Sequence, residues 1–559
     1  MHSKPWLAAY PTGVPEFIAP LSAAALPEYF DQIIGKHAQR PAFTSFGVTL
    51  TYAGLDVQSR HLCQYLLALR LPRQARVAIM LPNILQYPIS LLAVLRAGLT
   101  VVNTNPLYTA RELKHQLNDS GAEVIIILDN FAHVLAAVLP ETSVKHVIIT
   151  RLGDCFPFGK AWLTRIVLQW LKRQIPDYAI PGAIFFQQAL SAGRHEAYSP
   201  PALQCEDIAF LQYTGGTTGV SKGAMLTHRN MLSNISQTLC WITHGNLPGK
   251  ALIPGREVII TALPLYHIFA LTANFMVFFG LGAENILIAN PRDMPQFIRE
   301  LQRRRFTCIT GVNTLFDGLM NAAGFAALDF SALKIALAGG MPTRESTARR
   351  WRQLTGHSII EAYGLTEASP AVAINRLDCT EFSGSIGLPL PSTDCEIRDD
   401  AGEVLPPGAC GELYLRGPQV MQGYWKQPVE SVKELSADGW LKTGDIASMD
   451  EQGRLFIKDR IKDMILVSGF NVYPGEVEAV LSQHPDIAEC AAIGVADEKT
   501  GEAVKAFIVK RNPALDAAAV TAYCRQYLTA YKVPKLIEFR AELPKSAMGK
   551  VLRRALRNS

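Results

Sequence analysis

The sequence lacks the cysteine spacing that binds zinc or builds a disulfide framework. Its ten cysteines are scattered from Cys63 to Cys524, and no two of them form a CxxC pair. Zinc sites and disulfide-rich scaffolds need close, regular spacings. We therefore expect a protein of the reducing cytoplasm.

Long apolar runs are also missing. The most hydrophobic stretch, residues 268–289, is interrupted by Asn274 and Glu284 and falls short of a spanning helix. The N-terminal residues contain no continuous apolar segment of the kind found in secretory signals. The sequence predicts neither a transmembrane helix nor export.

Neither sign of charge dominates. The 559 residues carry 54 Lys and Arg against 49 Asp and Glu, a net charge of +5, and the cations form only short clusters. Nucleic-acid binding is therefore not predicted. The composition, 49% hydrophobic and 18% charged, is typical of a globular enzyme, and the length indicates several subdomains.

Glycine and hydroxyl residues are concentrated in one stretch, residues 213–230, which reads YTGGTTGVSKGAMLTHRN and follows an apolar run. Glycines let backbone N–H groups converge on an anion, hydroxyls add donors and Mg²⁺ ligands, and Lys222 adds a charge. The stretch is not a Walker A loop, because Lys222 lies between Ser221 and Gly223. A flexible linker is the alternative, but strand-like and helix-like segments flank the stretch. We predict a phosphate-binding loop.

Hydrophobic periodicity alternates between strand and helix along the first three-fifths of the chain. Strands are predicted at 77–81, 100–103, 124–128, 146–150, 258–263, 285–289, 307–310 and 335–338, with helices at 26–37, 52–69, 84–97 and 109–118. A capping box, Thr109 to Glu112, begins the last of these helices. Such alternation indicates an α/β fold with doubly wound parallel sheets.

The pattern of predicted secondary structure changes towards the C-terminus. From about residue 383, short strands separated by Gly, Pro and Asp turns predict a small β subdomain that ends near residue 459. The last 100 residues or so predict a separate α+β lid. We therefore divide the chain into an N-terminal domain, 1–459, and a lid, 460–559, joined by a hinge at about 459–462.

Residues 158–173, FGKAWLTRIVLQWLKR, predict an amphipathic helix. Trp162, Leu163, Ile166, Val167, Trp170 and Leu171 share one face, and Lys160, Arg165, Lys172 and Arg173 surround it. A basic amphipathic helix with two Trp residues is suited to a membrane surface. A helix packed on the core with a solvated face is an equally good interpretation.

Seven further motifs carry a resemblance that spans nearly the whole chain. They are NTNPLYTARELKHQLNDSGA from Asn103, TALPLYHIFAL from Thr261, ITGVNTLF from Ile309, YGLTE from Tyr363, GWLKTGD from Gly439, DMILVSGFNVYP from Asp463 and YKVPK from Tyr531. With the glycine-rich loop, and in this order, they resemble the adenylate-forming ANL superfamily of acyl-CoA synthetases, luciferases and peptide-synthetase adenylation domains. The chain is most similar to bacterial long-chain fatty acid–CoA ligases.

The resemblance implies an activity and its partners. It implies an enzyme that activates long-chain fatty acids with ATP and coenzyme A through an acyl-adenylate, releases AMP and pyrophosphate, uses Mg²⁺, and feeds β-oxidation and lipid synthesis. A fatty acyl-AMP ligase and a medium-chain acyl-CoA synthetase are the alternatives. A homodimer and peripheral contact with the inner face of the cell membrane stay open.

The resemblance also implies roles for individual residues. The residues that would hold the β and γ phosphates are Thr214, Gly215, Gly216, Thr217, Thr218, Gly219 and Lys222, and Thr214 and Glu367 would contact Mg²⁺. Gly340, Tyr363 and Gly364 would frame the adenine, and Thr366 would also bind the nucleotide. Asp445 and Arg460 would bind the ribose. Lys550 would be the catalytic lysine at the α-phosphate, and His267 would lie at the mouth of the acyl pocket. Lys462 and Gly469 would belong to the hinge and the coenzyme A path. Many relatives have two basic residues after the Asp-Arg pair, but Ile461 stands first here.

Overall fold

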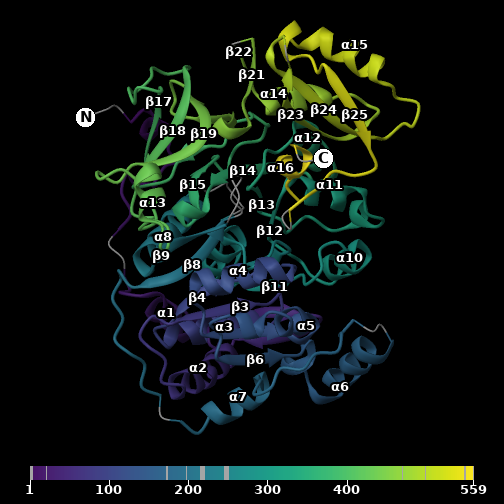
Figure 1. Ribbon diagram of the computed structural model, residues 1–559. Coiled ribbons are helices and arrows are strands. Elements are labelled where there is room, and N and C mark those ends of the chain that lie inside the picture. Colours follow the sequence, from purple (N-terminus) through teal and green to yellow (C-terminus); the bar gives the residue numbers. More distant parts are fainter. Residues whose placement is uncertain are drawn as a thin grey trace.

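The structure is a computed structural model. It describes residues 4–19, 22–171, 174–196, 198–214, 221–244, 251–468, 470–497, 499–546 and 549–557. The chain forms two large α/β layers, a small β subdomain and a C-terminal lid (Figure 1). The predicted fold class is confirmed.

The first layer is a seven-stranded sheet in the order β7-β6-β5-β3-β4-β8-β9. Its strands are β3 (Arg76–Met80), β4 (Thr100–Asn103), β5 (Val124–Leu128), β6 (His146–Thr150), β7 (Ile184–Phe185), β8 (Ile208–Thr214) and β9 (Lys222–Thr227). Its helices are α2 (Tyr52–Ala68), α3 (Gln86–Arg96), α4 (Ala110–Ser120), α5 (Ala132–Ala136) and α7 (Phe186–Gly193). All strand pairs are parallel except β8 with β9. The predicted capping box at Thr109 is present.

The second layer is a nine-stranded sheet in the order β16-β15-β14-β13-β12-β10-β11-β1-β2. Its strands are β1 (Pro41–Ser45), β2 (Val48–Thr51), β10 (Val258–Thr261), β11 (Glu284–Leu287), β12 (Cys308–Gly311), β13 (Ile335–Ala338), β14 (Ile359–Gly364), β15 (Ala371–Ile374) and β16 (Leu388–Pro389). Its helices are α1 (Leu26–His37), α8 (His228–His244), the π-helix η6 (Ala270–Met276), α9 (Val277–Gly280), α10 (Met294–Gln302), α11 (Asn313–Asn321) and α12 (Glu345–Thr355). One large hydrophobic core spans both layers.

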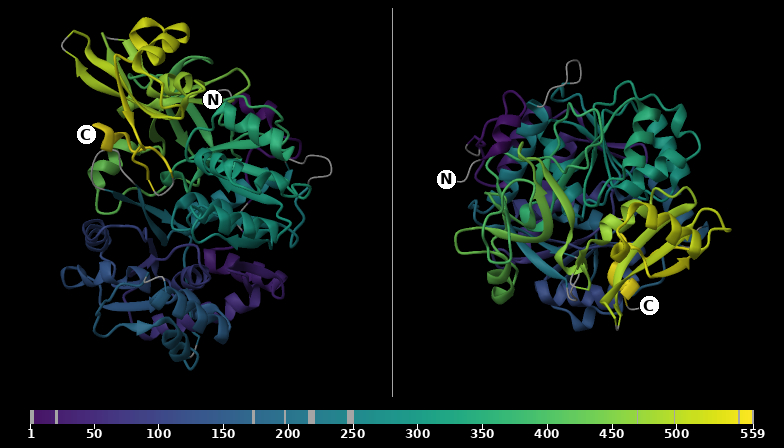
Figure 2. Two further views of the ribbon diagram at one scale, coloured as in Figure 1. Left: turned by 90° about the vertical axis from the view of Figure 1, so that its right-hand side faces the viewer. Right: turned by 90° about the horizontal axis from the view of Figure 1, so that it is seen from above.

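The β subdomain and the lid each have their own sheet. The β subdomain contains β17 (Asp394–Arg398), β18 (Cys410–Arg416), β19 (Leu441–Met449), β20 (Leu455–Arg460) and α13 (Pro428–Glu434). The lid contains β21 (Ile465–Val467), β22 (Phe470–Val472), β23 (Ile487–Asp497), β24 (Gly501–Lys510), β25 (Leu536–Arg540), α14 (Pro474–Leu481), α15 (Ala517–Tyr527) and α16 (Arg553–Arg557). The 3-10 helix η9 (Ile461–Asp463) joins the two. The C-terminal tail of the lid turns back towards the second layer (Figures 1 and 2).

The structure corrects the interpretation of the glycine-rich stretch. We expected one loop that leads directly into a helix, but Lys222–Thr227 forms β9, which pairs antiparallel with β8. The phosphate loop is therefore the connection of a hairpin. The sequence did not predict β9, because three of its residues are small or carry a hydroxyl and are as common in loops as in strands.

The predicted amphipathic helix is helical over residues 158–171, with 172–173 outside the described residues, and it is not packed on the core. Helix α6 (Phe158–Ile166) is followed by a π-helical segment, Val167–Leu171, and none of the α6 side chains is buried. Phe158, Trp162 and Leu163 are exposed at 88%, 60% and 56%. The interpretation of a core-packed helix is therefore wrong for α6. Among the described residues, no helix is long and apolar enough to cross a bilayer.

Candidate active site

An acidic residue of the β subdomain lies at the centre of the site. Asp445 on β19 is 3% exposed, and its register partner on β20 is Arg460. Arg460 Nε lies 3.0 Å from Asp445 Oδ1, and the Tyr363 hydroxyl donates to Oδ2 at 2.6 Å. Asp445 and Arg460, the two residues expected at the ribose, are thus paired. Tyr363, expected at the base, binds the same carboxylate.

Glu367 lies beside this group, in a 3-10 helix at Thr366–Ala368 that follows β14. Its Oε1 accepts a hydrogen bond of 2.8 Å from the hydroxyl of Tyr424, which also contacts Glu434. Burial raises the pKa of Glu367, and the charge of Arg460 acts in the opposite direction. The single hydroxyl hydrogen of Tyr424 therefore lies between the carboxylates of Glu367 and Glu434. One hydrogen cannot satisfy both carboxylates, so a cation can still bind to this pair.

Lys222 has partners in the β subdomain. Its Nζ lies 2.7 Å from Glu430 and 3.5 Å from Glu434, which share one face of α13, and 4.8 Å from the centroid of the Tyr424 ring. Burial lowers the pKa of Lys222, but the hydrogen bond to Glu430 and the charge of Glu434 raise it by more, so the net pKa is raised. Lys222 is therefore held as a cation at the base of the phosphate hairpin.

The donor set suits Mg²⁺. Thr214 ends β8, and its hydroxyl lies 3.5 Å from the carbonyl of Lys222, so the oxygen keeps free lone pairs. Thr214 and Glu367 provide hydroxyl and carboxylate oxygens, the ligands that Mg²⁺ prefers beside nucleotide phosphates. Within the described part of the chain, no three His, Cys, Asp or Glu side chains gather into a metal site. The residues thus fit an ion that receives most of its ligands from ATP and water.

Lys550 reaches the N-terminal domain from the lid. A Cβ on the preceding residue, Gly549, would lie 2.6 Å from Thr314 Oγ1 in the first turn of α11, so the tail touches that helix. Solvent still reaches Lys550. Surrounding protein atoms, and then the charge of Arg460, lower the pKa of Lys550 to about 8, while Asp445 raises it. The tail of the lid therefore carries Lys550 to the N-terminal domain at α11, within the electrostatic influence of Asp445 and Arg460.

His267 lies half-buried between β10 and η6. Its Nδ1 accepts a hydrogen bond of 3.3 Å from the Phe269 amide, and burial lowers its pKa to about 4, so the ring is neutral. An apolar cavity lies further along η6 and α9 and is lined by Ala273, Val277, Phe278, Ile309, Leu337 and Ile374, among others. Val277 is ten residues beyond His267, which corresponds to about 15 Å along a helix axis. A neutral ring near an apolar cavity suits an alkyl substrate.

The residues expected around the base converge at the ends of β13 and β14. Gly340 has φ +76°, and a Cβ on Gly364 would clash at 2.2 Å with the Pro370 carbonyl, so both positions require glycine. Thr366 begins the 3-10 helix that carries Glu367. Strand ends of this kind form ligand sites in open α/β sheets.

Several residues that sequence reasoning missed also belong to this region. Glu361 on β14 is 9% exposed, and burial raises its pKa to about 8. Tyr424, Glu430 and Glu434 surround Lys222 and Glu367. The spacing of the two glutamates after GYWKQP was a usable signal, because residues four apart share a helix face. Glu361 could not be predicted, because the hydrophobic pattern of β14 does not show that an acidic residue within it is buried.

Some predicted residues are placed elsewhere or lie outside the described residues. Lys462 is exposed in η9, and its carbonyl accepts from Arg557 at 3.4 Å. Gly215, Gly216, Thr217, Thr218, Gly219 and Gly469 lie outside the described residues. Their contacts, and the role of Lys462, stay predictions.

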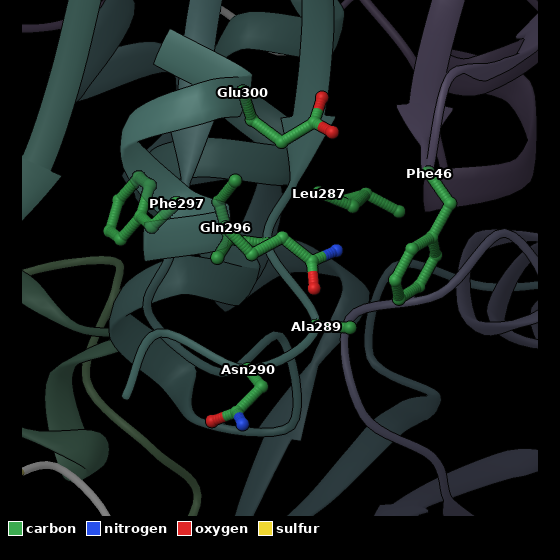
Figure 3. Close-up of a pocket in the computed structure, with 8 residues that line it drawn as sticks. Phe46, Leu287, Ala289, Asn290, Gln296, Phe297 and Glu300 are labelled. Carbon is green, nitrogen blue, oxygen red and sulfur yellow. The ribbon is translucent and has the colours of Figure 1, made fainter. Parts of the chain in front are cut away.

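A surface hollow lies apart from this site. It is formed between α10 and the turn that joins β1 to β2, where Gln296 and Glu300 project towards Phe46 (Figure 3). None of the predicted site residues lines it. The hollow therefore does not mark the nucleotide site.

Comparison with known proteins identifies the family. The pattern of the AMP-binding enzyme family matches residues 30–425, and the pattern of the AMP-binding enzyme C-terminal domain matches residues 476–550. The chain belongs to the AMP-binding enzyme family. The two matches lie on either side of η9.

Individual members of the AMP-binding family are similar over nearly the whole chain. A long-chain-fatty-acid–CoA ligase of Escherichia coli O6:H1 is 53% identical over 99% of this chain and 98% of that protein. The enzyme of the same name from Bacillus subtilis is 38% identical over 99% of this chain and 97% of its own length. The ATP-bound crystal structure of MatB from Rhodopseudomonas palustris is 27% identical, with a TM-score of 0.80 over 95% of this chain and 98% of that one. The resemblance predicted from the motifs is thus confirmed.

Proposed function

We propose that the protein is an ATP-dependent long-chain-fatty-acid–CoA ligase. The proposal rests on whole-chain similarity to ligases of that name and on one observation above all. The charges of Asp445 and Arg460 act on the ammonium of Lys550, which supports a role for this cation where a carboxylate and a nucleotide phosphate would repel each other. ATP, coenzyme A and a fatty acid are the substrates.

In the first half-reaction the fatty carboxylate attacks the α-phosphorus of ATP, and pyrophosphate leaves. Lys550 offsets the repulsion between the two anions and stabilises charge on the transferring phosphate. Asp445 and Arg460 bind the ribose, and Lys222 with the hairpin loop holds the outgoing phosphates. Mg²⁺ at Thr214 and Glu367 would supply positive charge to those phosphates.

In the second half-reaction the thiol of coenzyme A attacks the acyl carbon, and AMP leaves. The same lysine would obstruct a second substrate, so the lid rotates at about residues 459–462 between the two steps. The 3-10 helix η9 links β20 to β21, and its exposed residues Ile461 and Lys462 can absorb this change. The rotation withdraws Lys550 and presents residues 468–474 to coenzyme A.

The apolar cavity along η6 and α9 receives the alkyl tail. Its lining contains two threonines and otherwise only apolar side chains, and it begins about two helical turns beyond His267. Burial of methylene groups contributes about 0.8 kcal/mol each. The cavity has a volume of about 20 Å³ in this structure, so a long alkyl tail requires it to open along η6 and α9.

A substrate series with and without coenzyme A tests the function. With Mg-ATP and a long-chain acid, the wild type should release pyrophosphate without coenzyme A, and should form thioester and AMP only with it. Adenylate that coenzyme A cannot discharge would instead indicate a fatty acyl-AMP ligase. An optimum at medium-chain acids would support the other alternative, and absence of acid-dependent pyrophosphate would refute both steps.

The exposed face of α6 supports a working position in the cytoplasm at the inner face of the membrane. Phe158, Trp162 and Leu163 project into solvent, and residues 155–176 contain four Lys and Arg but no Asp or Glu. Anionic lipid attracts such a segment, and the aromatic and apolar side chains enter the interface. Lys160 anchors α6 by donating to the carbonyl of Phe46. Homodimer formation stays a prediction.

Vesicle sedimentation tests this contact. The wild type should bind vesicles that contain phosphatidylglycerol more strongly than vesicles of phosphatidylcholine alone, and Trp162→Ser with Leu163→Ser should lose most of that binding. Val432→Ser removes an exposed apolar side chain from α13 and serves as the matched control. Equal binding by all three proteins would refute the contact.

A further inference from the structure

We infer that Asp459 is a positioning residue that latches the lid in the pose that brings Lys550 to the nucleotide site. The inference rests on the proposed two-step reaction. Asp459 lies on β20, in the sheet of the β subdomain, and its side chain is 4% exposed. It stands two residues before η9, but both of its oxygens bind groups that follow η9.

One oxygen of Asp459 caps a helix of the lid. Its Oδ2 accepts from the amide of Gly475 at 2.6 Å, in the first turn of α14. The first amides of a helix have no partner inside it, and the residue before α14, Tyr473, provides no side-chain cap. The carboxylate also interacts favourably with the positive end of the helix dipole. A residue of the N-terminal domain thus completes a helix of the lid.

The other oxygen of Asp459, Oδ1, accepts from the adjacent Arg460 amide at 2.8 Å and also binds the tail that carries Lys550. Arg553, three residues beyond the lysine, places Nη1 3.4 Å from Asp459 Oδ1 and 3.1 Å from Asp463 Oδ2. Its Nη2 lies 2.9 Å from Glu478 on α14. The guanidinium thereby ties the tail to α14 and to the β subdomain together.

The position of each partner along the chain decides what a rotation would break. Within the hinge segment 459–462 we place the pivot at residues 461–462, because β20 ends at Arg460. Gly475, Glu478, Asp463 and Arg553 follow this pivot and move with the lid, whereas Asp459 lies on β20 and stays with it. A rotation at the hinge therefore preserves the contacts of Arg553 within the lid and breaks those with Asp459. Because the rotation would break these bonds, they shift the equilibrium towards the adenylate-forming pose.

Separate assays of the two half-reactions test the latch. In Asp459→Ala, formation of acyl-adenylate should slow by about tenfold, the usual effect of losing one charge-assisted hydrogen bond. Formation of thioester from synthetic acyl-adenylate and coenzyme A should stay unchanged or become faster. Asp459→Asn keeps an acceptor for the Gly475 amide, so its loss should be smaller.

Asp463→Asn is the matched control. It removes a carboxylate that contacts the same Arg553, but from the lid side, so it should change both half-reactions in equal proportion. Trypsin cleavage after Lys462 provides a readout that does not depend on activity, and it should be faster in Asp459→Ala than in the wild type.

Two outcomes would overturn the latch. Equal slowing of both half-reactions in Asp459→Ala would show a general structural role, and unchanged hinge cleavage would show that the lid is not released. A wild type that forms no acyl-adenylate refutes the proposed ligase function instead, and the cleavage assay still decides the latch in that case.

Discussion

The hydroxyl of Tyr363 donates to Oδ2 of Asp445 at 2.6 Å, although the two residues belong to different sheets and lie 82 positions apart. Arg460 binds the other oxygen of the same carboxylate at 3.0 Å. The surface that we propose for the nucleotide is therefore assembled by contact between the second layer and the β subdomain.

Asp445→Asn should weaken ATP binding. The substitution keeps the shape but removes the charge that orients Arg460, and hydrogen bonds to charged groups contribute about 1.5–3 kcal/mol. We expect the KM for ATP in pyrophosphate exchange to rise by about tenfold or more. Asp394→Asn, on β17 of the same subdomain, removes a carboxylate paired with Lys4 and Arg416 and should leave the KM unchanged. An equal rise in both variants would contradict the assignment.

Tyr424→Phe should raise the Mg²⁺ requirement. The variant removes the hydroxyl that donates to Glu367 at 2.8 Å and leaves that carboxylate without its orienting partner. A lost hydrogen bond of about 1 kcal/mol predicts a rise of about fivefold in the Mg²⁺ concentration for half-maximal adenylation. Tyr527→Phe, on the exposed face of α15, provides the control. An unchanged Mg²⁺ titration would count against Glu367 as a ligand.

Ala273→Leu should shorten the preferred acid. The larger side chain fills the apolar cavity along η6, and overpacking costs about 1–3 kcal/mol. The ratio of kcat/KM for palmitate over decanoate should therefore fall by about tenfold. Ala479→Leu, on the exposed side of α14, should not change this ratio. A uniform loss on all acids would show that the cavity does not hold the tail.

His228 should make stability depend on pH in the acidic range. Burial lowers its pKa to about 4, and its Nδ1 accepts from the Leu26 amide at 3.2 Å, so the folded protein keeps the ring neutral. The unfolded chain takes up the proton near its ordinary pKa of about 6.5, so folding stability is lost as pH falls from about 6.5 to 4. The loss reaches about 3 kcal/mol.

His228→Gln removes this proton uptake from the unfolded chain. The decline of Tm between pH 6.5 and 4 should become shallower in this variant, whereas exposed His195→Gln should follow the wild type. Parallel curves for all three proteins would refute the assignment.

The sequence predicted the buried parallel strands well, because short apolar runs with turns at both ends have few alternatives. β4, β5, β6 and β13 have the predicted bounds, and the other predicted strands of both layers lie within two residues of the observed ones. β9 was missed because its small and hydroxyl residues match a loop as well as a strand. The long-range partners were also missed. Tyr424 contacts Glu367 across 57 positions of sequence, and Arg553 contacts Asp459 across 94. Hydrophobic periodicity and local spacing cannot predict contacts between residues so far apart in sequence.

The most direct test of the account compares the two half-reactions in wild type and Lys550→Ala. Single-turnover formation of acyl-adenylate should fall by at least about 100-fold, because the lysine stabilises charge that develops in the first step. Thioester formation from synthetic acyl-adenylate and coenzyme A should stay within a few-fold of the wild type. In the wild type, kcat/KM of the first step should decline above about pH 8, where the free lysine loses its proton. Lys545→Ala, in the same tail but paired with Glu489, should behave as the wild type. Equal loss of both steps in Lys550→Ala, or of neither, would contradict the account.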